Sequence, residues 1–287
     1  MRLRVRHTTR FRYSEEIADT AMEMRLRPID DMRQRLVSYR LTVTPRGPIH
    51  GYTDVLGNHV ETWNFRAPHR EIVVTSEATV ETLAVSEAST TAPVLAVAKR
   101  YQMTRFDGPV LTNGRVRELA ALVRQAGGDP LAGATEAIHR GFTYAPNTTT
   151  VHSTVEEITV RGAGVCQDFA HLWIAICRAM GIPARYVSGY VASQPAAGGS
   201  IGQASHAWAE GWREGQGWIG YDPTNWSTTT GGRVGDQHIR VAVGRDYRDV
   251  PPTRGVYRGL AEESLTVDVR VEALPSAALA GSGANPT

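Results

Sequence analysis

Cysteine is scarce in this chain of 287 residues: only Cys166 and Cys177 occur. Both lie in one stretch with helical periodicity, where eleven positions correspond to a rise of roughly 16 Å. A disulfide requires a Cα–Cα separation of about 4.4–6.8 Å, so we expect two free thiols and no disulfide framework. Free thiols fit a reducing compartment, and we therefore predict a cytoplasmic location.

Long apolar runs are also absent. No stretch of 18 consecutive apolar residues occurs, so we expect no membrane-spanning helix. The first residues, MRLRVRHTTRFRY, alternate basic and apolar side chains and lack the apolar centre of a secretory signal. These two absences predict a protein without a membrane partner.

Neither sign of charge dominates the composition. The chain has 31 Lys and Arg against 29 Asp and Glu, which gives a formal net charge of +2 and a pI of about 8.6. The charges are scattered, which argues against nucleic acid as a partner. Paired CxxC or HxxxH spacings and acidic calcium-binding loops are missing as well, so we expect no metal and no cofactor.

The sequence changes character near residue 90. Residues 1–90 contain short alternating runs such as RLRVRHTTRFRY and HVETWNF, which predict an N-terminal β-rich domain with a sandwich or barrel-like form. Residues 91–274 show helical patterns first and strand patterns afterwards, which predicts an α+β domain. Residues 275–287, PSAALAGSGANPT, have the composition of a disordered tail.

Three helices are predicted in the second domain. NGRVRELAALVRQAG predicts a helix with Asn113 as its N-cap, and DPLAGATEAIHRGF predicts another that Asp129 caps. The third and most regular helix runs over 166–180 and ends at Gly181. We interpret TAPVLAVAKRYQMTRFDGP, at the start of this domain, as connecting chain.

Cys166 begins the third predicted helix, directly after the glycines Gly162 and Gly164. A helix N-terminus carries unpaired N–H groups and favours negative charge, so it favours the thiolate, the reactive form of cysteine. Cys166 is therefore a candidate nucleophile, and the alternative is a small, half-buried residue near a helix start. Cys177 lies in the apolar interior of the helix, and we interpret it as structural.

A nucleophilic thiol needs a base, usually a histidine, and nine histidines are present. His171 shares the helix but is rotated by about 140° and displaced by about 7.5 Å from Cys166, so we interpret it as structural. We expect four histidines on the surface of the N-terminal domain: His7, His50, His59 and His69. No partner is evident from the sequence for three others: His139, His152 and His238.

His206 differs from the other histidines because it begins the strand pattern SHAWAEGW, which turns near REGQG and returns as GWIGYD. A hairpin centred on Glu214 would place His206 directly opposite Asp222, with Cβ atoms about 4.5–5.5 Å apart. A carboxylate there fixes the tautomer of the imidazole and stabilises its charged form. The alternatives are an ordinary surface ion pair and a metal site built from Cys166, His206 and Asp222.

Four segments follow one another in the order GVCQDFAHL, GIPARYVSGY, SHAWAE and YDPTN. Together they resemble the transglutaminase-like superfamily of papain-like thiol enzymes, and in particular the bacterial transglutaminase-like proteins with an N-terminal β-rich domain. The downstream segment VAVGRDYRDVPPTRGVYRG resembles the same subfamily. The resemblance implies a catalytic core in residues 91–274, in which the helix with the cysteine packs on an antiparallel sheet.

The resemblance also implies roles for three residues: Cys166 as the nucleophile, His206 as the general base and acid, and Asp222 as the residue that orients His206. Such a site acts on amide or peptide bonds through a thioester. With water as the acceptor the protein is a peptidase or amidase, the reading that we favour. With an amine as the acceptor it is a cross-linking transglutaminase, and a third alternative is a binding module that only retains the fold.

The same reading predicts a peptide or protein substrate. The backbone N–H of Cys166 would meet the oxyanion together with one further donor. The candidates for this donor are Tyr144, in the extended stretch FTYAPN, and Gln167. Trp208, two residues after His206, is a candidate lining of the acyl channel, and the alternative is a residue that packs in the core.

Overall fold

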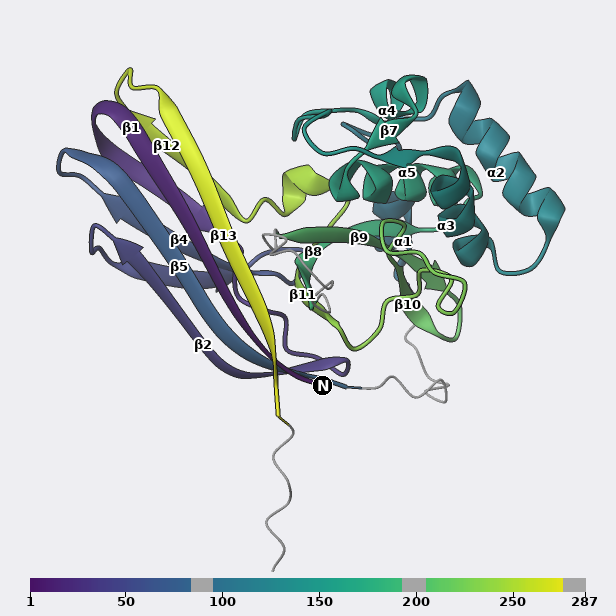
Figure 1. Ribbon diagram of the computed structural model, residues 1–287, viewed down its shortest axis with the longest axis horizontal. Coiled ribbons are helices and arrows are strands. Elements are labelled where there is room, and N and C mark those ends of the chain that lie inside the picture. The colour runs from purple at the N-terminus through teal and green to yellow at the C-terminus, as the bar shows by residue number, and fades with distance from the viewer. Residues whose placement is uncertain (84–94, 193–204, 276–287) are drawn as a thin grey trace, which may run out of the picture.

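A computed structural model describes residues 1–83, 95–192 and 205–275 of the chain. Figure 1 shows two parts beside each other, a large curled sheet and a unit of helices packed on a smaller sheet. The protein is thus α+β, as the order of the sequence patterns predicted. All but the first residue of the predicted tail lies outside the described residues.

The large sheet is antiparallel and contains seven strands in the described part of the chain, in the order β2-β5-β1-β4-β3, with β12 and β13 also paired to β1. The strands are β1 (Arg2–Met24), β2 (Gln34–Thr44), β3 (Ile49–Thr53), β4 (His59–Phe65), β5 (His69–Thr82), β12 (Thr253–Arg258) and β13 (Glu263–Leu274). Buried and exposed residues alternate along β1 and β5, because only one face of the sheet packs against a core.

Strand β1 is 23 residues long and belongs to both halves of the large sheet. Its first half, residues 2–13, lies between β5 and β13, and its second half, residues 20–24, lies between β4 and β12. A register shift between Arg12 and Ile17 separates the two halves, and such irregularities bend and twist a strand. The predicted N-terminal β-rich module is therefore formed by one curled sheet around a core that includes Trp63 and Ile72.

The two C-terminal strands, β12 and β13, belong to the large sheet and not to the second part of the protein. We assigned residues 253–274 to the second domain, but β13 pairs with β1 from Arg2↔Leu274 to Tyr13↔Glu263. Figure 1 shows this strand, in yellow, beside the purple first strand. The strand pattern of residues 263–274 is local, whereas its pairing partner lies some 260 residues away and leaves no local signal.

The second part contains five α-helices and a four-stranded antiparallel sheet in the described residues. The helices are α1 (Val97–Thr104), α2 (Gly114–Ala126), α3 (Pro130–Gly141), α4 (Val155–Arg161) and α5 (Cys166–Ala179). The sheet has the order β10-β9-β8-β11, with β8 (Ala184–Val191), β9 (His206–Arg213), β10 (Gly217–Tyr221) and β11 (His238–Gly244). Two short strands, β6 (Thr143–Tyr144) and β7 (Ala163–Gly164), pair in parallel, and a 3₁₀ turn covers Tyr247–Asp249.

The predicted caps of two helices are confirmed. The Asn113 side chain accepts a hydrogen bond from the N–H of Val116 at 2.9 Å, and the Asp129 side chain accepts one from the N–H of Leu131 at 3.0 Å. Helix α1 lies in the stretch that we interpreted as connecting chain, so that interpretation was wrong. Helix α4 was also missed, although the spacing of Thr154 before the helix to Glu157 within it forms a capping box.

Helix α5 is the central element of the second part. Its side chains are buried from Asp168 to Arg178, and they pack on β8 and β9 on one side and on the other helices on the opposite side. Trp173 is fully buried and donates from Nε1 to the Thr135 hydroxyl at 2.8 Å. A helix enclosed on all sides has little freedom to shift, so its first residue, Cys166, is held in a fixed place.

Strand β11 is an edge strand of the small sheet and faces the large sheet (Figure 1). Side-chain amides from the N-terminal part pair with its backbone. Gln34 donates to the carbonyl of Arg240 and accepts from its N–H, both at 2.8 Å. Asn58 does the same with Val243, at 2.9 Å and 2.7 Å. These amides satisfy backbone groups that an uncovered edge would leave unpaired.

We predict that Asn58→Ala lowers the free energy of unfolding by about 2–4 kcal/mol, because it leaves the buried N–H and carbonyl of Val243 without partners. Urea unfolding followed by circular dichroism measures this change. Asn64→Ala, at an exposed position of the same strand region, is the control and should change the stability by less than about 0.5 kcal/mol. Equal stability of the two variants would contradict the role of the Asn58 amide.

Candidate active site

Two glycines shape the chain just before Cys166. Gly162 ends α4 with a φ of 70°, a left-handed conformation that favours glycine. A Cβ on Gly164 would lie 2.8 Å from the side chain of Asp168, so only glycine allows this close approach. The first residue of α5 is then Cys166, a half-buried free thiol at a helix N-terminus.

The turn that carries Cys166 is held by the buried carboxylate of Asp168. Its Oδ2 accepts hydrogen bonds from the N–H of Val165 at 2.8 Å and from the hydroxyl of Thr149 at 2.6 Å. The first bond closes the start of α5, and the second ties it to the preceding loop. Cys166 therefore lies on a backbone that is fixed from two sides.

His206 and Asp222 meet as predicted, although the register of the hairpin differs. Tyr221 pairs with Ala209, so the turn is centred one residue later than the predicted Glu214. The predicted register was wrong for this reason, and the two residues are diagonal rather than opposite neighbours. A displacement of two residues keeps both side chains on one face of the sheet. Nε2 of His206 reaches Oδ2 of Asp222 at 2.7 Å.

The carboxylate of Asp222 is 1% exposed and accepts five hydrogen bonds. Its Oδ2 accepts from His206 at 2.7 Å, from the Asn225 amide at 2.8 Å and from Nε2 of His238 at 3.1 Å. Its Oδ1 accepts from the N–H groups of Thr224 at 3.0 Å and Asn225 at 3.2 Å. These donors replace the water that a buried carboxylate loses.

The surroundings shift the pKa values of His206 and Asp222 in opposite directions. Burial alone would raise the pKa of Asp222, but the charge of His206 and the hydrogen bonds from His206 and His238 hold it well below its ordinary value. Burial alone would lower the pKa of His206, but the Asp222 carboxylate and the Cys166 sulfur outweigh burial and raise it to about 10. His206 is therefore an imidazolium at neutral pH.

Cys166 completes the group, since its sulfur is one of the neighbours that raise the pKa of His206. Because Nε2 of His206 is engaged by Asp222, Nδ1 is the ring nitrogen that remains for the sulfur. The structure thus brings together the three residues that were predicted to act jointly. A thiol, an imidazole and a carboxylate in a row can form a thiolate–imidazolium pair.

Sequence reasoning missed His238 and Asn225. The pattern HIRVAVG correctly predicted a strand, but nothing in it indicates that its first residue lies beside the loop that follows β10. Asn225 lies in the motif YDPTN, three residues after Asp222, and this short spacing is a signal that could have been used. Both side chains donate to the same carboxylate oxygen.

Three side chains of this group could also serve as metal ligands: His206, Asp222 and His238 have ligand atoms within 4.8 Å of one another. The set differs from the predicted alternative, in which Cys166 was the third member. The N–H of Gly235 points at Nδ1 of His238 at 3.4 Å, which leaves the ring proton on Nε2, toward Asp222. A metal on Nε2 would require the opposite tautomer, so the hydrogen bonds favour the metal-free arrangement.

The three further candidate residues, Tyr144, Gln167 and Trp208, lie in different surroundings. Tyr144 is half exposed, its ring lies 6.2 Å from that of Phe169 in α5, and burial together with the negative charges of Cys166 and Asp168 raises its pKa. The Gln167 side chain donates to the carbonyl of Val151 at 3.1 Å and is thereby occupied. Of these two candidates for the second oxyanion donor, Tyr144 has the better position.

Trp208 is fully buried and therefore lines no channel. Its indole lies against the rings of His206 and His238, at centroid distances of 6.1 Å and 5.1 Å. The predicted substrate-lining role is replaced by one in packing: Trp208 fills the space behind the two histidines and limits how their rings can turn.

The structure also shows where the other histidines lie, and two of them are not where we expected. His7 and His69, expected at the surface, are buried, and His7 bonds to the Tyr190 hydroxyl at 2.9 Å. His171 is structural as expected: it is buried, its Nε2 accepts from the N–H of Tyr247 at 3.1 Å, and burial lowers its pKa to about 4. His139, for which no partner was evident, stacks on Trp226 at 4.3 Å.

The chain is similar to known proteins over most of its length. Residues 3–81 match the bacterial transglutaminase-like N-terminal region, and residues 119–223 match the transglutaminase-like superfamily. An uncharacterized protein of Mycobacterium leprae is 34% identical over 284 residues, which cover 95% of this chain and 99% of that protein. The chain belongs to the transglutaminase-like superfamily and carries the N-terminal region of its bacterial members.

Two further similarities cover different extents of the chain. A protein-glutamine gamma-glutamyltransferase of Pseudomonas aeruginosa is 32% identical over 132 residues, which cover 40% of this chain but 19% of that enzyme. The crystal structure of a candidate cysteine protease from Cytophaga hutchinsonii has a TM-score of 0.73 and 21% identity, and it covers 96% of this chain and 91% of its own. The second similarity shows that both parts of the fold occur together in another protein.

The expectation about membrane-spanning segments can be compared with the helices of the structure. Within residues 1–83, 95–192 and 205–275, no helix combines the length and the apolar character needed to cross a bilayer.

We predict that His206 and His171 titrate at opposite ends of the pH scale although both are buried. Histidine NMR of the wild type should show His206 protonated through neutral pH and titrating near pH 10, with His171 neutral down to about pH 4. In Asp222→Asn the pKa of His206 should fall by several units, because burial then acts without the carboxylate. An unchanged pKa of His206 in that variant would contradict the assigned cause.

Proposed function

We propose that this protein is a cysteine-dependent acyl-transfer enzyme that cleaves amide or peptide bonds through a thioester, with water as the acceptor. The observation that supports it is the contact of Cys166 with His206, whose other ring nitrogen is 2.7 Å from the buried carboxylate of Asp222. Each of the three side chains supplies a function that the next one requires.

The geometry supports a two-step reaction. The Cys166 thiolate, formed by proton transfer to His206, attacks the carbonyl carbon of the substrate. The His206 imidazolium then protonates the leaving nitrogen, the C–N bond breaks, and an acyl thioester remains on Sγ. In the second step His206 takes a proton from water, the resulting hydroxide attacks the thioester, and the carboxylic acid leaves as the C–S bond breaks and the Cys166 thiolate is restored beside the His206 imidazolium.

The negative oxygen of each intermediate needs hydrogen-bond donors. The N–H of Cys166 lies in the first turn of α5, where helix N–H groups have no partner within the helix. We propose this N–H as the first donor and the Tyr144 hydroxyl as the second. The short pairing of Tyr144 with Gly164 keeps this tyrosine beside the cysteine turn.

The acceptor separates the two main alternatives. Water is always present, and cross-linking of cytoplasmic proteins would be harmful, so we propose hydrolysis of a peptide or protein substrate in the cytoplasm. Both cysteines are free thiols, in keeping with that compartment. An amine acceptor is the second candidate, and the similarity to a protein-glutamine gamma-glutamyltransferase over 132 residues favours it.

We predict that Cys166→Ala abolishes turnover, with a loss of at least about a thousandfold, and leaves the melting temperature within a few degrees of the wild type. The assay incubates a pool of glutamine-containing peptides with and without a primary amine, and mass spectrometry distinguishes hydrolysed from amine-linked products. Cys177→Ala, at the buried thiol of the same helix, is the matched control and should retain turnover. Undiminished turnover in Cys166→Ala would refute the assigned nucleophile.

We also predict that Cys166 is alkylated by iodoacetamide well below the ordinary thiol pKa of about 8.5, and that His206→Ala removes this reactivity. Peptide mass spectrometry measures labelling against pH. Cys177 is the internal control and should stay unlabelled, because burial raises the pKa of its thiol well above the ordinary value. Labelling of Cys166 that follows an ordinary thiol and ignores His206 would favour a binding module that only retains the fold.

A further inference from the structure

His238 is held in one orientation beside the same Asp222 oxygen that His206 binds. Its side chain is 9% exposed, and its Nε2 lies 3.1 Å from Oδ2 of Asp222. Because Gly235 donates to Nδ1, the proton is on Nε2 and the ring donates to the carboxylate. The Trp208 indole meets the ring edge-on at 5.1 Å and 77°. Both nitrogens and one side of the ring are thus fixed.

Residues of the N-terminal sheet hydrogen-bond with the backbone on both sides of His238. Two residues before it, the carbonyl of Asp236 accepts a hydrogen bond from the Thr82 hydroxyl of β5 at 2.6 Å. Two residues after it, the backbone of Arg240 pairs with the Gln34 amide of β2 in both directions at 2.8 Å. The backbone of His238 is therefore positioned by residues of the other part of the protein.

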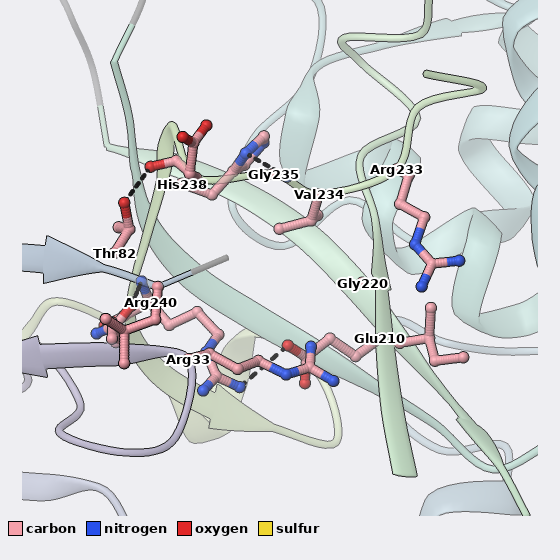
Figure 2. A pocket seen from close by; sticks show the side chains of 13 residues that line it. Arg33, Thr82, Glu210, Gly220, Arg233, Val234, Gly235, His238 and Arg240 are labelled. Carbon is pink, nitrogen blue, oxygen red and sulfur yellow. Dashed lines mark hydrogen bonds and ion pairs between the residues drawn. The ribbon is translucent and has the colours of Figure 1, made fainter. Parts of the chain in front are cut away.

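A cavity of about 300 Å³ lies at the junction of the two parts and has His238 in its wall. Figure 2 shows Arg33 and Thr82 entering it from the N-terminal part, and Glu210, His238 and Arg240 from the small sheet. Among the described lining residues, neither Cys166 nor His206 nor Asp222 occurs. His238 thus lines a cavity to which the three residues of the candidate active site do not contribute.

From these contacts we infer that His238 is a positioning residue: its hydrogen bond holds the Asp222 carboxylate toward His206, and the N-terminal sheet holds His238. Without this bond, Oδ1 of Asp222 keeps its two backbone donors but Oδ2 keeps only His206 and the Asn225 amide, so the direction of Oδ2 toward His206 is less restricted. His206 would then lose orientation, and the thiolate of Cys166 would lose its partner. The inference rests on the proposed function and assigns the N-terminal sheet a part in it.

Other charges near His238 are already paired or lie at the rim of the cavity. Glu210 is fully buried between Arg185 and Arg240, with which it forms ion pairs at 2.5 Å and 3.3 Å. Asp236 lies 4.0 Å from the amino group of Met1. The remaining charged groups that face His238 or line its cavity are Asp222, His206, Arg33 and Arg233. Because these groups are present in every variant below, comparison between variants isolates the bond to Asp222.

The test is the pH dependence of Cys166 alkylation in wild type and in His238→Ala, His238→Gln and His238→Asn. A glutamine places its amide nitrogen where Nε2 of histidine lies, so it can still donate to Asp222, whereas asparagine ends where Nδ1 lies. We expect the onset of labelling to rise by about one pH unit in the alanine and asparagine variants, a roughly tenfold slower reaction below the onset. The glutamine variant should restore the wild-type onset. His50→Ala, at an exposed histidine of the N-terminal sheet, is the control.

The outcomes separate this inference from the proposed function. If the wild-type thiol shows ordinary reactivity, the proposed function fails. If the wild-type thiol is activated but the onset is the same in all three His238 variants, the proposed function stands and the positioning role is overturned. If His238→Ala does not fold, the comparison of the glutamine and asparagine variants decides, and equal onsets in these two overturn the role.

The contribution of the N-terminal sheet is tested with Thr82→Val, which keeps the shape of the side chain and removes the hydroxyl that holds Asp236. The onset should move in the same direction as in His238→Ala, by a smaller amount. In the His238→Ala background the valine substitution should have no further effect, because coupled residues are not additive. A shift of equal size in both backgrounds would overturn the route through His238.

Discussion

The buried charge of Asp222 constrains the whole candidate active site. A carboxylate that is 1% exposed is stable only when hydrogen-bond donors replace its water, and here five donors do so. They come from the start of β9, the loop after β10 and the start of β11. Three segments must therefore converge on one point, and this convergence places His206 between the carboxylate and the thiol. The chemistry and the stability of this region depend on the same contacts.

Strand β11 connects Asp222 to the N-terminal sheet, because its first residue binds the carboxylate and its outer edge binds that sheet. As an edge strand it presents backbone groups that need partners, and the N-terminal sheet supplies them through Gln34 and Asn58. A side-chain amide offers one donor and one acceptor, as a peptide group does, so two such residues replace part of a neighbouring strand. Because His238 begins β11, the docking of the two parts and the support of Asp222 are physically one arrangement.

Local features of the fold could be predicted from the sequence, and non-local ones could not. The caps at Asn113 and Asp129 depend on neighbouring residues, and they appear where the patterns placed them. The contact of His206 with Asp222 could be predicted because both side chains lie on the same face of one hairpin. A register error of two residues leaves them on that face. The contact of His238 with Asp222 depends on the order of strands in the sheet, for which a single sequence holds no local signal.

Two buried histidines show why burial alone does not decide chemical function. Nε2 of His171 accepts a hydrogen bond from the N–H of Tyr247, and a proton on that nitrogen would meet a donor. Nε2 of His206 faces the Asp222 carboxylate, which can only accept a hydrogen bond, so a proton on this nitrogen is stabilised. Desolvation lowers the pKa of both rings, yet one reaches about 4 and the other about 10, so the partner outweighs burial. The helix that carries His171 also carries two thiols, and the one at its first turn is the one that meets the charged histidine.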